Sequence, residues 1–113
     1  MRTFPTIAAF AFASVIYPYT FSVWFHTSFS IAHELRHIWQ IKYNEKFYLE
    51  TYKTIDLCYS VEEYNLQPAE IDANAFAYIV MVDFFGIKPL FNGLSDTVKS
   101  KIMERVEYLK DVL

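Results

Sequence analysis

The clearest pattern of apolar and polar positions in the chain runs from Pro68 to Phe85. A proline loses nothing in the first turn of a helix, where its missing N–H would have no partner, and Gly86 can end the helix as a C-cap. Between these two residues the apolar positions recur at helical spacing, which predicts a helix. The stripe consists of Ala69, Ala73, Phe76, Ala77, Val80, Met81 and Phe84.

A second amphipathic helix is predicted at the C-terminal end of the sequence. Ser95 can cap it, and its apolar residues are spaced by three or four: Val98, Ile102, Val106, Leu109 and Leu113. We expect this helix to lie across the core. The preceding segment from Asn44 to Leu66 has no clear period and predicts only a connector.

The N-terminal half begins with a long uncharged run from Phe4 to Phe25. Pro5 and Pro18 interrupt it, and "YTFSVWF" alternates like a half-buried strand, so we favour strands or a buried helix over a membrane span. Thr27, Ser28 and Ser30 then offer N-caps for a helix. Its apolar residues at helical spacing are Ile31, Leu35, Ile38 and Trp39.

These elements together predict an α+β fold. We expect a single domain, residues 1–113, in which a short N-terminal sheet backs the helix that follows Ser30. An edge of that sheet could bind a peptide as an added strand.

Composition and charge narrow the class of protein. The chain is 54% hydrophobic with a net charge of -3, and its ten Lys and Arg residues are scattered, which argues against nucleic acid as a partner. The single cysteine, Cys58, is typical of a buried thiol in a reducing compartment, so we expect a cytoplasmic protein. Membrane anchoring through Phe4 to Phe25 is the alternative.

The stretch "HELRH" contains the residues with the most distinctive chemistry. His33 and His37 are one helical turn apart, so both rings can face one point, as tetrahedral zinc requires. Glu34 lies about 100° further round the helix, which makes it a poor ligand but places its carboxylate for general-base work beside the metal. Because so short a motif also occurs by chance, a third ligand is needed.

The helix from Pro68 supplies candidates for that ligand. Glu70 in its first turn shares a face with Asn74, and a site of His33, His37 and Glu70 would keep a fourth position open, as in catalytic zinc centres. Asp72 is the rival ligand, but it projects from a different face of the helix. We therefore prefer Glu70.

With "HELRH" followed by "EIDANAF", the sequence resembles the gluzincin clan of zinc metallopeptidases. The likeness is to its smallest members, the minigluzincins and the small prophage and stress peptidases that cleave regulators. It implies Glu70 as third ligand and Asn74 as the partner of a ligand histidine. The sequence departs from the clan where Asn74 replaces a frequent carboxylate and where Arg36 replaces a frequent glycine.

Larger zincins also supply a Tyr or His that stabilises the oxyanion. Tyr64, Tyr43 and His26 are candidates for that role here, and Tyr64 is the one we favour as an oxyanion stabiliser. No spacing singles out any of them, because the chain has nine tyrosines and His26 lies in an aromatic stretch.

The resemblance predicts a zinc-dependent metallopeptidase with one Zn²⁺ per chain, acting on peptides or proteins, and an endopeptidase rather than an exopeptidase. Glu34 would be the general base. Two alternatives stay open: a catalytically silent zincin-like module that binds a protein, and a small membrane-associated protein in which the motif is coincidental.

Overall fold

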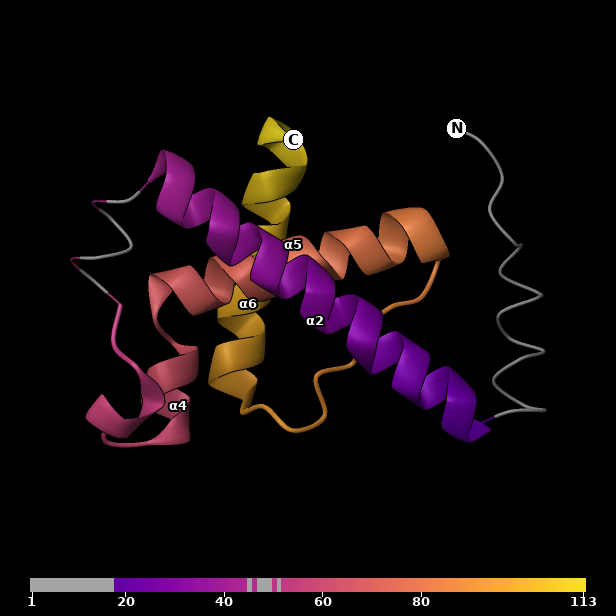
Figure 1. Cartoon of the computed structure of the whole chain (residues 1–113), viewed down its shortest axis with the longest axis horizontal. Helices are drawn as coiled ribbons and strands as arrows, with labels where there is room; N and C mark the ends of the chain where they lie inside the picture. The colour runs from indigo at the N-terminus through magenta and orange to yellow at the C-terminus, as the bar shows by residue number, and fades with distance from the viewer. Residues whose placement is uncertain (1–17, 45, 47–49, 51) are drawn as a thin grey trace.

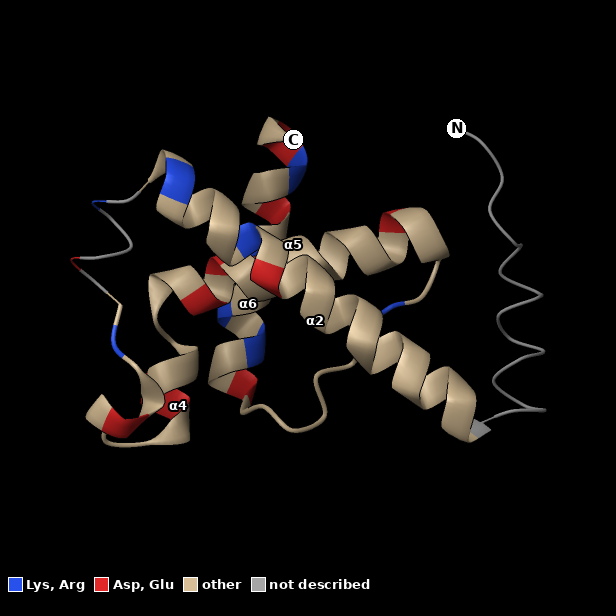
Figure 2. Ribbon diagram, in the orientation of Figure 1, with Lys and Arg blue, Asp and Glu red and all other residues tan. Residues whose placement is uncertain are grey.

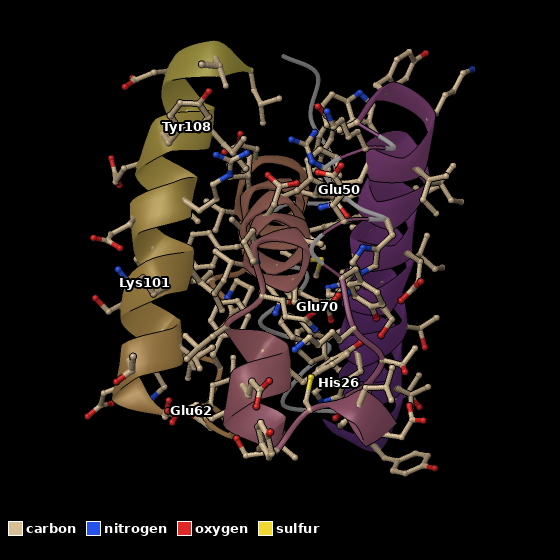
Figure 3. All side chains as sticks on the ribbon, turned by 90° about the vertical axis from the view of Figure 1, so that its left-hand side faces the viewer. His26, Glu50, Glu62, Glu70, Lys101 and Tyr108 are labelled. Carbon is tan, nitrogen blue, oxygen red and sulfur yellow. The ribbon has the colours of Figure 1, made fainter. Side chains whose placement is uncertain are left out.

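Helix α5 (Pro68–Phe85) lies between the two other long helices, α2 (Pro18–Tyr43) and α6 (Asp96–Val112). Figure 1 shows α2 crossing α5, and the view in Figure 3 places α5 in the middle with α6 and α2 on either side. The 3-10 turn η1 (Ile55–Leu57) and the short helix α4 (Val61–Asn65) precede α5. This computed structural model describes residues 18–44, 46, 50 and 52–113.

The expected α+β architecture is wrong, because the described part of the chain contains helices and no strand. The stretch "YTFSVWF", expected as a strand, forms the first turns of α2. Two of its aromatic rings pack together and onto α5: Trp24 lies 5.8 Å from Phe21 and 5.0 Å from Phe85, measured between ring centroids. These contacts outweigh the β preference of the aromatic residues, which depends strongly on context.

The rest of the expected sheet, residues 4–17, lies outside the described residues. The same holds for most of the run from Phe4 to Phe25 that was considered as a membrane anchor. No helix in the described ranges is both long enough and apolar enough to cross a bilayer.

The N-terminus of α2 also differs from the sequence-based expectation. Thr27, Ser28 and Ser30, expected as caps, lie inside the helix, which starts at Pro18. A proline is compatible with a first helical turn, so Pro18 begins this helix instead of interrupting it. The apolar residues that predicted the helix face outward, with Ile31 56%, Leu35 55% and Ile38 60% exposed.

The ends of α5 and α6 confirm the predictions made for them. Pro68 opens α5 in its first turn, and Gly86 ends it in the left-handed conformation with φ 67°. The N–H of Ile87 bonds to the carbonyl of Met81, which completes a glycine-type C-cap. The Ser95 hydroxyl accepts a hydrogen bond from the N–H of Val98 at the start of α6.

The apolar core lies between α5 and α6. All four of the buried residues of α6 were predicted, and each is at most 1% exposed: Val98, Ile102, Val106 and Leu109. They pack on Ile71, Ala75 and Tyr78 of α5. Apart from the ion pair between Arg105 of α6 and Asp72 of α5, the cohesion of this contact comes from apolar burial.

The opposite face of α5 packs on α2 and is largely polar. The carboxylate of Asp72, 4% exposed, accepts hydrogen bonds from Arg36 Nε at 2.7 Å, Gln40 Nε2 at 2.9 Å and Arg105 Nε at 2.8 Å. Small residues flank this polar layer on α5, where Ala69, Ala73 and Ala77 are fully buried. Their small size lets the polar side chains of α2 reach across to α5. Figure 2 shows the charged residues of α2 confined to its C-terminal half.

Asp72→Asn is expected to lower the free energy of unfolding by about 3–5 kcal/mol, because it leaves a buried guanidinium without its counter-charge. Urea denaturation followed by circular dichroism measures the loss. Asp83→Asn, at an exposed position in the same helix, is the matched control and should stay within about 0.5 kcal/mol of the parent. Equal stability of the two variants would contradict the structural role of Asp72.

Candidate metal centre

Helix α2 presents His33 and His37 on consecutive turns, and their Nε2 atoms lie 3.0 Å apart. Glu70 of α5 faces both rings, with Oε1 3.5 Å from Nε2 of His33 and Oε2 2.6 Å from Nε2 of His37. Figure 3 shows Glu70 at the centre of the molecule. His33, Glu34 and His37 offer ligand atoms within 4.8 Å of one another, so this group could hold a metal ion.

Amide side chains fix the orientation of both imidazoles. Nδ1 of His33 lies 2.8 Å from Oδ1 of Asn74, and Nδ1 of His37 lies 2.8 Å from Oε1 of Gln40. The amide nitrogen of Gln40 donates to the carbonyl of Ala69 and to Asp72, so its oxygen must face His37. A carbonyl oxygen can only accept, which assigns the N–H of each ring to Nδ1 and directs the Nε2 lone pairs at Glu70.

Glu70 is 3% exposed, and its Oε2 is buried without a hydrogen bond despite the short contact with His37. Burial opposes its ionisation, but hydrogen bonds from the two imidazoles, whenever the rings also carry a proton on Nε2, outweigh burial and lower the pKa of Glu70 to about 2. Burial likewise lowers the pKa of His37, but Glu70 and Gln40 raise it overall. When both rings are neutral, three electron-pair donors converge on one point, which a proton or a metal ion could occupy.

The spacing of these donors fits a metal ion. Ligand bonds of about 2.0–2.1 Å at tetrahedral angles place two ligand atoms roughly 3.3 Å apart. The separations of 3.0 and 3.5 Å lie around this value, whereas the 2.6 Å between His37 and Glu70 is shorter and is a hydrogen-bond distance. The geometry and the unsatisfied oxygen of Glu70 therefore fit a divalent ion held by two imidazoles and a carboxylate.

Glu34 occupies the solvent side of this cluster. Its side chain is exposed, and with His26, Thr27, Ser30 and Ile31 it lines a shallow hollow of about 350 Å³. The carboxylate thus lies close to the histidines and remains accessible to water.

The other predicted residues have different partners in the structure. Asn74 contacts His33, as described above, whereas Asp72 is turned toward Arg36 and Arg105. Tyr64 bonds to the hydroxyl of Tyr52 at 2.8 Å. Burial, this bond and the charge of Glu70 all raise the pKa of Tyr64.

The two other oxyanion candidates are not brought to the histidines. Tyr43 is 62% exposed at the end of α2, where it contacts Trp39. His26 borders the hollow beside Glu34 but has no recorded contact with His33 or His37. Among the three candidates, Tyr64 has the closest electrostatic connection to the cluster.

Sequence reasoning missed two residues that surround the histidines. Gln40 follows His37 by three positions, and this spacing on a helix was a usable signal for a partner of the ring. Tyr52, whose ring centroid lies 6.1 Å from that of His37, comes from the connector and gave no such signal.

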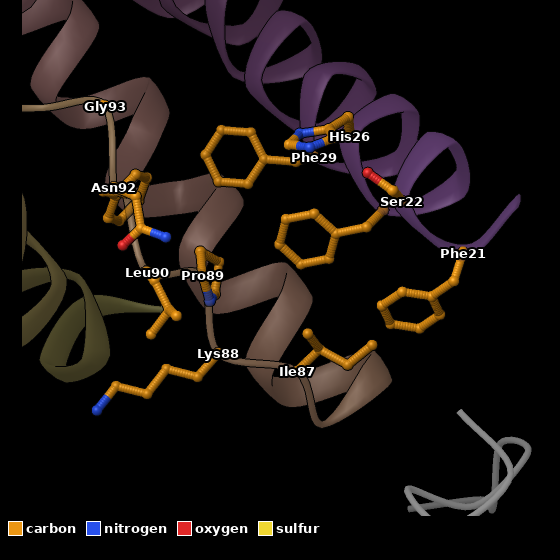
Figure 4. A pocket seen from close by; sticks show the side chains of 12 residues that line it. Phe21, Ser22, His26, Phe29, Ile87, Lys88, Pro89, Leu90, Asn92 and Gly93 are labelled. Atoms are coloured by element: carbon orange, nitrogen blue, oxygen red, sulfur yellow. The ribbon is translucent and has the colours of Figure 1, made fainter. Parts of the chain in front are cut away.

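An apolar pocket of about 530 Å³ begins one turn before His33. Phe29 lines this pocket and also lies near the histidine cluster: its ring centroid is 6.4 Å from that of His33 and 5.7 Å from that of Phe91. Figure 4 shows side chains of α2 on one side of the pocket and the segment 87–93 on the other. Its walls are mainly aromatic and aliphatic, and the polar or basic residues in them are Ser22, His26, Lys88 and Asn92.

Comparisons with protein-family models, curated proteins and solved structures find no match to this chain. The resemblance to gluzincins therefore rests on the two short motifs and on the convergence of His33, His37 and Glu70. It stays a prediction.

Long-range ¹H–¹⁵N NMR spectra should show Nδ1 of both His33 and His37 protonated at neutral pH. Asn74→Ala removes the acceptor for His33 alone, so only the His33 ring should shift toward the Nε2–H form. His26 is exposed and makes no hydrogen bond in the described part of the chain, so its signals serve as the reference for an imidazole whose tautomer is not fixed. An unprotonated Nδ1 on either ring of the parent would contradict the assignment.

Proposed function

We propose that the protein is a zinc-dependent metallopeptidase of the gluzincin type, with one Zn²⁺ held by His33, His37 and Glu70. The observation that supports this most directly is the convergence of the buried Glu70 carboxylate with the two imidazoles, Oε1 with Nε2 of His33 and Oε2 with Nε2 of His37. Two imidazoles and one carboxylate are a donor set typical of catalytic zinc sites, which keep a fourth position open.

When bound, zinc would supply Lewis acidity, polarising the substrate carbonyl and making a water molecule acidic near neutral pH. Glu34 is the residue of the chain suited to accept the proton of that water, because its carboxylate is exposed and close to both histidines. The same carboxyl group can then pass the proton to the amine that leaves. Asn74 and Gln40 keep the imidazoles in the tautomer that directs Nε2 at the site.

Tyr64 is the proposed stabiliser of the negative charge that develops on the substrate carbonyl. Its raised pKa keeps the phenol protonated, as a hydrogen-bond donor must be. Tyr52 holds the Tyr64 hydroxyl in place through their 2.8 Å contact.

The substrate in this proposal is a peptide or protein cut within its chain. The apolar pocket beside Phe29 is large enough for a bulky apolar side chain, in the size range of small-molecule sites. A cytoplasmic location is kept as part of the proposal, in line with the single Cys58, which is unpaired.

Metal analysis of protein purified without chelator should find about one zinc per chain. Glu70→Gln removes the charge but keeps the size of the side chain, and it should weaken zinc binding about 10-fold or more, because a neutral amide is a poor ligand. Glu104→Gln, at a side chain 65% exposed on α6, is the control and should bind zinc as the parent does. No zinc after purification, and none on titration, would contradict the proposal.

Glu34→Gln should keep the zinc and lower the turnover of a peptide library, read by mass spectrometry, by about 10²–10⁴-fold. The amide has the same shape but cannot take a proton. Cleavage at parental rate would exclude Glu34 as the base. If zinc-loaded parent protein cuts no peptide and instead retains one, the alternative of a silent binding module is favoured.

A further inference from the structure

Asp72 is shared between two arginines, and this leaves one positive charge without a partner. Arg36 makes a two-point contact with the carboxylate, through Nε at 2.7 Å and Nη2 at 3.3 Å, and Arg105 adds Nε at 2.8 Å. Gln40 donates a fourth hydrogen bond, at 2.9 Å. The carboxylate is therefore saturated, while two guanidinium groups carry the charge of two cations against one anion.

The remaining N–H groups of these arginines have no acceptor within the described residues. Nη1 of Arg36 and both terminal nitrogens of Arg105 make no recorded hydrogen bond or ion pair. Aromatic rings cover the guanidinium faces instead, with Arg36 4.0 Å from the Trp39 ring and Arg105 4.5 Å from the Tyr108 ring. Stacking occupies the faces and leaves the edges, where the N–H groups lie, free to donate.

Both arginines line one half-enclosed cavity of about 290 Å³ between the ends of α2 and α6. Asp72 is the only acidic residue recorded in its wall. The nearby carboxylates of Glu104 and Glu107 on α6 pair with Lys101 and Lys110. The excess positive charge therefore faces this half-enclosed cavity, where it attracts an incoming anion more strongly than on an open surface.

The rest of the wall is apolar or carries neutral amides. Trp39, Tyr108, Leu109 and Val112 form the apolar part, and Asn44 adds an amide at the rim. We propose that this cavity binds the carboxylate of an organic acid with an apolar body, such as the C-terminal residue of a peptide. The carboxylate would accept hydrogen bonds from the remaining N–H groups of Arg36 and Arg105. Two parallel N–H···O bonds from one guanidinium are the geometry that such pairs favour. The apolar body would lie on the aromatic wall.

This binding site contains none of the candidate metal ligands, although Gln40 in its wall also contacts His37, and it does not depend on the proposed peptidase activity. N-acetylphenylalanine is a suitable probe, and its amide is the uncharged control. The Trp39 indole N–H signal in ¹H–¹⁵N NMR spectra reports binding, and Trp24, which packs on Phe85, is the internal reference. The acid should shift the Trp39 signal and bind at least about 10-fold more tightly than the amide, since the charge-assisted hydrogen bonds are lost in the amide.

Arg105→Gln should weaken binding of the acid by a further factor of about 10 or more, and Arg105→Lys, which keeps charge but loses the fork, by less. Lys101→Gln removes one positive charge from the same helix outside the cavity and should leave binding unchanged. Binding at the metal centre is tested separately with Glu70→Gln, which should leave the affinity for the acid unchanged if the acid binds in the cavity of Arg36 and Arg105. If Arg105→Gln fails to fold, Arg105→Lys still tests whether the paired N–H donors of the guanidinium are needed for binding.

Three results would overturn the proposal. Equal affinity for the acid and the amide would show that charge is not recognised, and unchanged binding in both Arg105 variants would place the ligand elsewhere. Inorganic phosphate that binds as tightly as the acid, with the same dependence on Arg105, would show that the apolar wall contributes nothing and that the ligand is a compact oxyanion.

Discussion

The structure depends on the burial of one carboxylate between three helices. Asp72 of α5 is held by Arg36 and Gln40 of α2 and by Arg105 of α6. A buried carboxylate is tolerated only where donors surround it, so these contacts fix how far each helix can slide or rotate. The same contacts determine which turn of α2 faces Glu70. The histidines meet the glutamate because Asp72 sets the register between the helices.

The two faces of helix α5 pack in different ways, and they constrain the choice of residues differently. Apart from the Arg105–Asp72 ion pair, its contact with α6 is apolar and tolerates many side chains of similar volume. Its contact with α2 is a set of directional hydrogen bonds between particular groups, flanked by alanines that keep the helices close. The first face stabilises the fold, and the second specifies one alignment of the helices. The chemistry lies on the face where alignment is specified.

The sequence predicted those parts of the fold where local signals agree with tertiary packing. Pro68, Gly86 and Ser95 mark helix ends by backbone chemistry that acts within one turn, and the stripe of α6 faces a core. The N-terminal part of α2 was mispredicted as a strand because its aromatic segment alternates, whereas the helix that carries His33 and His37 was predicted. In the structure, Trp24 of that segment packs on Phe85 from a helix. Similarly, the spacing within each helix indicated His33, His37, Glu70 and Asn74. The position of Tyr52 depends on the path of the connector, which no short-range pattern encodes.

The convergence of His33 and His37 with Glu70 joins two helices that are separated by the long connector between residues 44 and 67. An ion held by all three residues would act as a reversible cross-link that closes the chain from residue 33 to residue 70. Such a closure reduces the conformational freedom of the unfolded chain, as a disulfide does, but without needing an oxidising compartment. The free energy of ion binding would then contribute directly to the free energy of folding. The concentration of available metal would therefore determine how firmly α2 is held to the rest of the molecule.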